Sequence, residues 1–114
     1  MSIATVSGVV IDCRRPQALA EFYAKALGGT VTSADDTWAT VEAAPLNLSF
    51  QFVADYEHPV WPGAKYLHLD LTVADRAAAV KALLELGATL PPHQPGGEDW
   101  TVLLDPAGHP FCVL

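Results

Sequence analysis

ALGGTV at residues 26–31 returns as ELGATL at residues 85–90, a displacement of 59 residues from position 26 to position 85. Each copy ends a stretch with the spacing of a helix. The surroundings match too: an apolar extended run precedes each copy and a tryptophan-led strand follows it, at 9–13 and 38–41 in the first half and at 67–73 and 100–103 in the second. A recurring unit of this kind indicates one supersecondary module used twice, with a binding site expected between the copies.

Hydrophobic spacing and turn residues predict the secondary structure of both copies. In the first copy, Pro16 suits a first helical position and Gly28 suits a helix end. In the second copy, Asp75 is placed to cap a helix and Gly87 to end it. We therefore expect helices at 16–28 and 76–86, and strands at 4–13, 29–33, 37–43, 47–53, 66–73, 88–94, 99–104 and 110–114.

These elements describe one α+β domain built from two tandem β-α-β-β-β modules. Module one spans about 4–53 and module two about 66–114. Residues 54–65 contain two prolines and a glycine without periodicity, which is typical of a connector. A length of 114 residues with 51% hydrophobic content is enough for a single compact core.

Composition and charge exclude several classes of protein. A net charge of −7, from 13 acidic residues against 6 lysines and arginines, argues against nucleic-acid binding. No run of about 18 apolar residues predicts a membrane span, and the first residues do not read as an export signal. Cys13 and Cys112 lie in apolar runs, as buried thiols of a reducing compartment do, so we expect a cytoplasmic protein. Phosphate-loop, paired-CxxC and Gly-x-Ser-x-Gly motifs are absent.

Three segments resemble the glyoxalase/bleomycin-resistance/dihydroxybiphenyl-dioxygenase group, the vicinal oxygen chelate proteins. They are His68–Asp75, which leads into a helix, Leu104–Phe111, which closes the chain, and the first-half segment Cys13–Gly28. The chain is most similar to the short glyoxalase-like domains of that group. The resemblance implies a cup-shaped mixed sheet with the helices outside, a small-molecule ligand and a homodimer.

Metal-dependent members of the family bind a divalent ion through the first and last strands of each module. The matching positions in this chain are Gly8, Gln51, His68 and Cys112. Glycine has no donor atom, Gln51 offers a neutral amide, and Cys112 stands where glutamate is usual in the family. Magnesium and manganese prefer charged oxygen ligands, and zinc or nickel several strong donors, so this set is poor. We expect no obligatory cofactor, with a divalent metal as the alternative.

Five residues are the candidate ligand contacts: His68, Asp70, Gln51, Trp38 and Trp100. His68 and Asp70 alternate on one strand face, which suits a cavity base tuned by a carboxylate, or a histidine merely satisfied by that carboxylate. Trp38 and Trp100 hold matching places in the two modules. They are interpreted either as opposing aromatic walls of a binding site or as core residues. His109 lies in a Pro- and Gly-rich turn and is predicted to be structural.

Three functions remain open at this stage. The first is binding of a small organic molecule in the inter-module cup without an obligatory metal. The second is a metal-dependent enzyme of the same fold, a glyoxalase-type lyase, an isomerase or a dioxygenase, with His68 as metal ligand or base. The third is a non-catalytic interaction module whose cup is filled by its own side chains.

Overall fold

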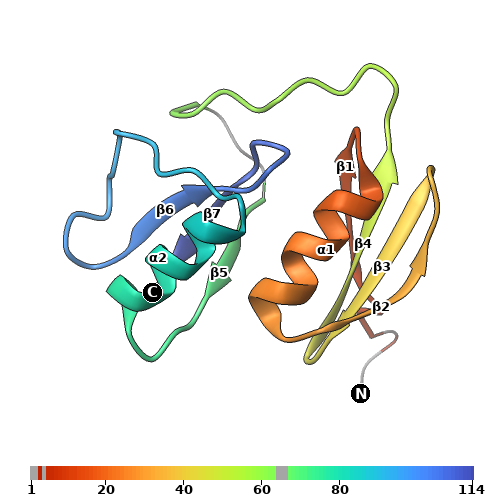
Figure 1. Cartoon of the computed structure of the whole chain (residues 1–114), viewed down its shortest axis with the longest axis horizontal. Helices are drawn as coiled ribbons and strands as arrows, with labels where there is room; N and C mark the ends of the chain where they lie inside the picture. The colour runs from red at the N-terminus through yellow and green to blue at the C-terminus, as the bar shows by residue number, and fades with distance from the viewer. Residues whose placement is uncertain (1–2, 4, 64–66) are drawn as a thin grey trace. The chain divides into compact units, whose positions relative to one another are not determined.

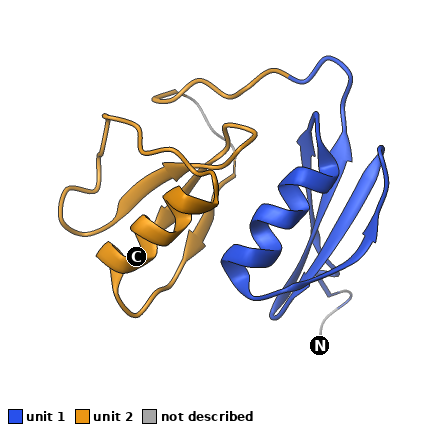
Figure 2. Cartoon of the chain, in the orientation of Figure 1, with its two compact units in different colours: residues 1–56 blue, residues 57–114 orange. Residues whose placement is uncertain are grey.

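A computed structural model describes residues 3, 5–63 and 67–114 (Figure 1). The expected strand starts at residues 4 and 66 lie outside these described residues. The expected strands 4–13 and 66–73 are shorter than predicted, because the described residues 5–8, 67–68 and 72–73 are not in strands. The chain divides into two compact units, residues 1–56 and 57–114 (Figure 2). Each unit has its own sheet and its own helix, and the α+β class predicted from the sequence is confirmed.

The first unit has the predicted β-α-β-β-β order. Its strands form one sheet in the order β1-β4-β3-β2, in which β1 runs parallel to β4 and the other neighbours are antiparallel. The elements are β1 (Val9–Cys13), α1 (Pro16–Leu27), β2 (Thr30–Ala34), β3 (Trp38–Ala43) and β4 (Leu46–Phe52). Pro16 begins α1 and Gly28 ends it at φ +69°, a left-handed conformation that favours glycine.

Alternation along the strands separates the two faces of this sheet. Ala39 and Val41 of β3, and Leu48 and Phe50 of β4, are buried beneath α1. The Tyr23 ring of α1 stacks on Phe50 with the ring centroids 5.5 Å apart. Burying each large apolar side chain of this kind stabilises the fold by about 1.5–3 kcal/mol.

The β2–β3 turn is held by one carboxylate. Asp35 Oδ1 accepts hydrogen bonds from the Thr37 N–H (2.8 Å), the Thr37 hydroxyl (2.8 Å) and the Trp38 N–H (2.9 Å). These hydrogen bonds, that of the Thr37 N–H first, lower the pKa of Asp35 below its usual value of 3.8. Asp35 thereby fixes the point at which Trp38 enters β3.

We predict that Asp35→Ala lowers the melting temperature at neutral pH and that the difference from wild type shrinks in acid. A carboxyl group whose pKa is lower in the folded state stabilises the fold above its unfolded-state pKa. That contribution is lost as the pH falls from 3.8 through the lower folded value. Thermal unfolding of both proteins between pH 2.5 and 7 measures the difference; a gap that widened in acid would contradict the assignment.

The second unit has a three-stranded sheet in the order β5-β7-β6. β5 runs parallel to β7, and β6 antiparallel to it. The elements are β5 (Leu69–Leu71), α2 (Arg76–Leu86), β6 (Thr101–Leu104) and β7 (Pro110–Val113). As predicted, the Asp75 side chain caps α2 by accepting from the Ala78 N–H (3.1 Å), and Gly87 ends α2 at φ +119°.

The strand expected at 88–94 is absent as a strand and survives as a single antiparallel bridge, Thr89 with Leu104. Pro91 and Pro92 cannot donate backbone hydrogen bonds, which prevents a longer ladder along β6. The Gln94 side chain replaces the missing partner: its Nε2 donates to the Val102 carbonyl (2.8 Å), and its Oε1 accepts from the Val102 N–H (2.8 Å). One side-chain amide therefore imitates a peptide unit of the missing strand.

Gln94→Ala is predicted to destabilise the protein by about 1–3 kcal/mol, because buried Val102 would lose the partners of both backbone polar groups. Gln94→Glu should also be destabilising, since a carboxylate cannot donate to the Val102 carbonyl. Urea unfolding measures both, with exposed Gln17→Ala as the matched control. Equal stability of the Gln94 and Gln17 variants would refute the peptide-mimic role.

Within the described residues, neither helix is long or apolar enough to cross a membrane.

Candidate functional site

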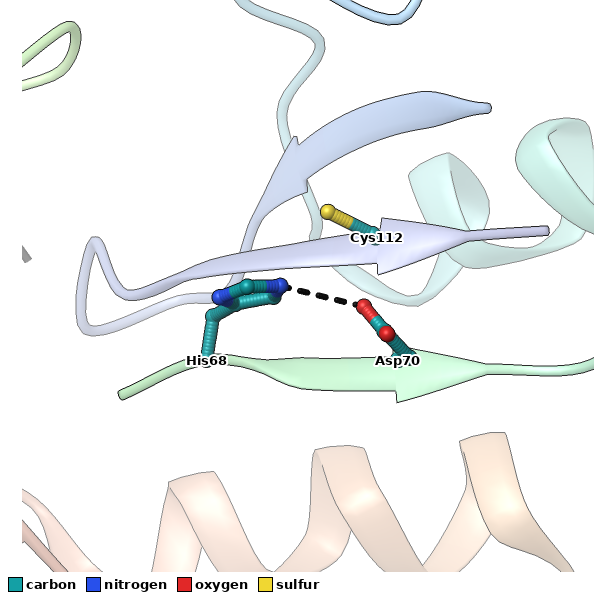
Figure 3. A group of neighbouring side chains, drawn as sticks. All are labelled: His68, Asp70 and Cys112. Atoms are coloured by element: carbon teal, nitrogen blue, oxygen red, sulfur yellow. Dashed lines mark ion pairs between the residues drawn. The ribbon is translucent and has the colours of Figure 1, made fainter. Parts of the chain in front are cut away.

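His68, Asp70 and Cys112 come together on one face of the second sheet (Figure 3). Asp70 of β5 pairs directly with Cys112 of β7. His68 lies two residues before Asp70, and the two-residue period of an extended chain directs both side chains to the same face. One candidate ligand atom from each of the three residues lies within 4.8 Å of the other two.

The His68–Asp70 contact defines how the two side chains are hydrogen-bonded. His68 Nε2 lies 3.1 Å from Asp70 Oδ1. An ionised carboxylate only accepts hydrogen bonds, so Nε2 carries the proton and donates it. In the neutral ring, Nδ1 is then the acceptor. The sequence left open whether His68 contacts a ligand or only forms a hydrogen bond with Asp70. The structure shows the Asp70 contact, which is compatible with both roles.

This pair contributes little to stability. The side chains of His68 and Asp70 are 36% and 54% exposed. Ion pairs and charged hydrogen bonds at such exposure stabilise a fold by about 0–1 kcal/mol, because solvent screens them. The pair is therefore accessible to a ligand at small cost to the fold.

A pocket of about 290 Å³ lies beside the pair and is formed by residues of the second unit. His68, Asp70 and Cys112 contribute its polar side. Its apolar side includes Trp61, Pro95, Trp100 and Val102. Pockets that bind small organic molecules have this composition, with mostly apolar walls and a few polar groups that set orientation.

The two tryptophans are fixed by the loop that replaces the missing strand. The Trp61 indole N–H donates to the His93 carbonyl (3.1 Å). Trp100 packs directly against Gly96, where an added Cβ would overlap the indole ring. The sequence predicted Trp100 as a ligand contact but did not predict Trp61. Trp61 belongs to the connector, so the repeat offers no matching residue that would have identified it.

The remaining candidates, Trp38 and Gln51, belong to the first unit, where they face each other across the β3–β4 pair. The Trp38 indole N–H donates to the Thr40 hydroxyl (3.0 Å), and Gln51 Nε2 donates to Asp12 Oδ1 (3.3 Å). The pocket just described does not include these two residues. Their role in ligand binding stays a prediction.

Strand register offers a second way to match positions in the two modules. Phe50 and Phe111 are fully buried on the last strand of each module, and their direct partners on the first strands are Ile11 and Leu69. The residue before each partner is then Val10 in module one and His68 in module two. This register matches Val10 with His68, whereas the helix-cap residues Arg15 and Asp75, which are 60 residues apart, match Gly8 with His68. Neither Val10 nor Gly8 has a side-chain donor atom, so module one lacks a ligand at this position.

The donor atoms present do not match the four-position metal set of the resembled family. Gly8 and Val10 provide none, and the Gln51 amide is hydrogen-bonded to Asp12. The second module has a different set of its own: an imidazole nitrogen, a carboxylate oxygen and a thiol sulfur. Zinc and similar soft divalent ions accept these three donor types.

His109 is confirmed as a turn residue. The buried Asp105 carboxylate accepts from the backbone N–H groups of Ala107 (2.8 Å) and His109 (3.0 Å), and lies 3.0 Å from His109 Nδ1. Gly108 completes the turn at φ +87°. Asp105 therefore organises the turn before β7, with His109 as one of its partners.

The family model described as glyoxalase-like domain matches residues 8–114. Comparison with curated proteins gave no match.

Several solved structures share the fold. A glyoxalase family protein from Enterococcus faecalis is 22% identical with a TM-score of 0.72, over 99% of this chain and 98% of that one. A glyoxalase/bleomycin resistance protein/dioxygenase family enzyme from Burkholderia phytofirmans is 23% identical with a TM-score of 0.72, over 96% and 97%. Fosfomycin resistance protein FosX from Mesorhizobium loti is 15% identical with a TM-score of 0.70, over 98% and 91%. At these identities the likeness shows the fold alone.

Proposed function

Because this chain belongs to the glyoxalase-like domain family, we propose that it binds a small organic molecule with a flat apolar body, without an obligatory metal. The observation behind this proposal is the pocket of the second unit. There, two indole rings stand beside one exposed hydrogen-bonding pair, His68 and Asp70.

The apolar walls and the polar groups of the pocket have different roles in binding. Trp61 and Trp100 offer large, rigid apolar surfaces, which give affinity at low conformational cost. The Asp70 carboxylate and the His68 ring offer polar contacts that select one orientation of the ligand. A volume of about 290 Å³ suits a molecule of one or two fused rings.

Trp38 and Gln51 are proposed as ligand contacts of the first module. They pair across adjacent strands, and Gln51 holds the same place in its module as Cys112 does in the second. The proposal includes a homodimer, as the family resemblance implies, and a reducing cytoplasmic location, because Cys13 and Cys112 are buried thiols.

The test is a calorimetric screen of the protein against flat bicyclic compounds, with Trp100→Ala and Trp38→Ala as a matched pair. Trp100→Ala is expected to weaken a confirmed ligand by about tenfold or more, since it removes one wall of the pocket. Trp38→Ala tests separately whether the first module contributes to binding of that ligand. The proposal fails if a well-folded protein binds no member of the panel, or if Trp100→Ala binds as wild type does.

A second candidate function is a metal-dependent lyase, isomerase or dioxygenase. It is favoured by the convergence of His68, Asp70 and Cys112 within 4.8 Å. These three side chains would hold an ion such as zinc, which when bound supplies a Lewis acid for a substrate with neighbouring oxygens. Because His68 Nε2 faces Asp70, an ion bound at Nε2 would replace the His68–Asp70 hydrogen bond.

Cobalt(II) titration of chelator-treated protein tests this second candidate. A thiolate ligand gives an intense near-ultraviolet charge-transfer band, which Cys112→Ser should abolish and zinc should displace. Cys13→Ser is the matched control, because Cys13 is also a buried thiol but lies in β1. Absence of the band from wild type, or its persistence in Cys112→Ser, would rule this candidate out.

A further inference from the structure

We propose that the ligand of the second-unit pocket is a flat organic cation with at least one N–H group, such as an amidinium or a protonated aromatic amine. This inference rests on the binding function proposed above and specifies the chemistry of its ligand. Hydrogen-bonding character, charge and aromatic walls each point to it.

Hydrogen-bonding character comes first. The Asp70 carboxylate only accepts hydrogen bonds. His68 uses its Nε2 proton on that carboxylate, so the neutral ring presents an acceptor at Nδ1. Trp61 has already donated its indole N–H to the His93 carbonyl. The polar pair therefore presents acceptors, and a complementary ligand brings donors.

Charge selects the sign of the ligand. Among the described residues, the pocket lining contains a carboxylate, Asp70, and neither lysine nor arginine. The hydrogen bond from a neutral imidazole leaves the negative charge of Asp70 in place, and this side chain is 54% exposed and accessible. The net charge of −7 on the whole chain also concentrates cations near its surface and repels anions.

The aromatic walls suit the same ligand. A cation placed over an indole face is attracted by the negative face of the ring system, most strongly for tryptophan among the aromatic residues. Trp61 and Trp100 both line the pocket next to Asp70. An amidinium group is planar and offers N–H groups in a fork, which is the geometry that pairs best with a carboxylate.

Three probes of nearly equal shape separate charge from shape: 2-naphthamidine is cationic, 2-naphthamide neutral and 2-naphthoate anionic. Calorimetric titration in the presence of a chelator, which removes metal ions as a variable, measures their affinities. We expect the amidine to bind about tenfold or more tighter than the amide, and the carboxylate to bind weakest.

Two aspartate variants identify the source of the preference. Asp70→Asn keeps the shape of the side chain and removes its charge, so it should lower amidine affinity about tenfold while amide affinity stays within about twofold. Asp55→Asn removes the same charge from an exposed turn of the first unit and should leave the preference intact. Circular dichroism verifies that both variants fold.

The outcomes distinguish this inference from the function on which it rests. Equal or tighter binding of the amide or the carboxylate overturns the cationic ligand and leaves the pocket as a binding site. A cation preference that survives Asp70→Asn overturns the assignment to this pocket. If the amidine does not bind, the inference is overturned. The proposed function is overturned as well only if no compound of the wider bicyclic panel binds the protein.

Discussion

Parallel pairing between the first and last strands of each module is the constraint on which the rest of the structure depends. Ile11 opposite Phe50, and Leu69 opposite Phe111, direct two apolar side chains toward the helix side of each sheet. Because side chains alternate along a strand, the neighbouring pairs must face the other way. Those pairs are Asp12 with Gln51 and Asp70 with Cys112. The polar face is thus a direct consequence of core packing.

The two modules use this shared framework differently. In the first, β2 and β3 complete a regular four-stranded sheet, and the Asp35 turn fixes their junction. In the second, Pro91 and Pro92 remove the donors a further strand would need, and the Gln94 side chain supplies the hydrogen bonds that β6 would otherwise lack. The chain freed from the sheet forms a loop instead, and that loop contributes Pro95 and Trp100 to the pocket.

The His68–Asp70 pair contributes little to stability, and ligand binding is the role that we propose for it. Both side chains are substantially exposed, where a hydrogen-bonded pair adds little to the free energy of unfolding. Buried Asp105 offers a contrast in the same module: its carboxylate is fully enclosed and organises the turn around His109. Two histidine–carboxylate contacts of similar length therefore have different physical roles, and burial separates them.

The sequence by itself determined the local elements and the repeat, because these depend on neighbouring residues. Pro16, Gly28, Asp75 and Gly87 mark the helix ends where the structure has them, and the two-residue period of the extended chain places His68 and Asp70 on one face. Only the tertiary structure decided that Cys112 lies beside Asp70 and that Trp61 joins the pocket. Strand register and loop packing between distant residues determine these contacts, and residue spacing along the chain does not encode them.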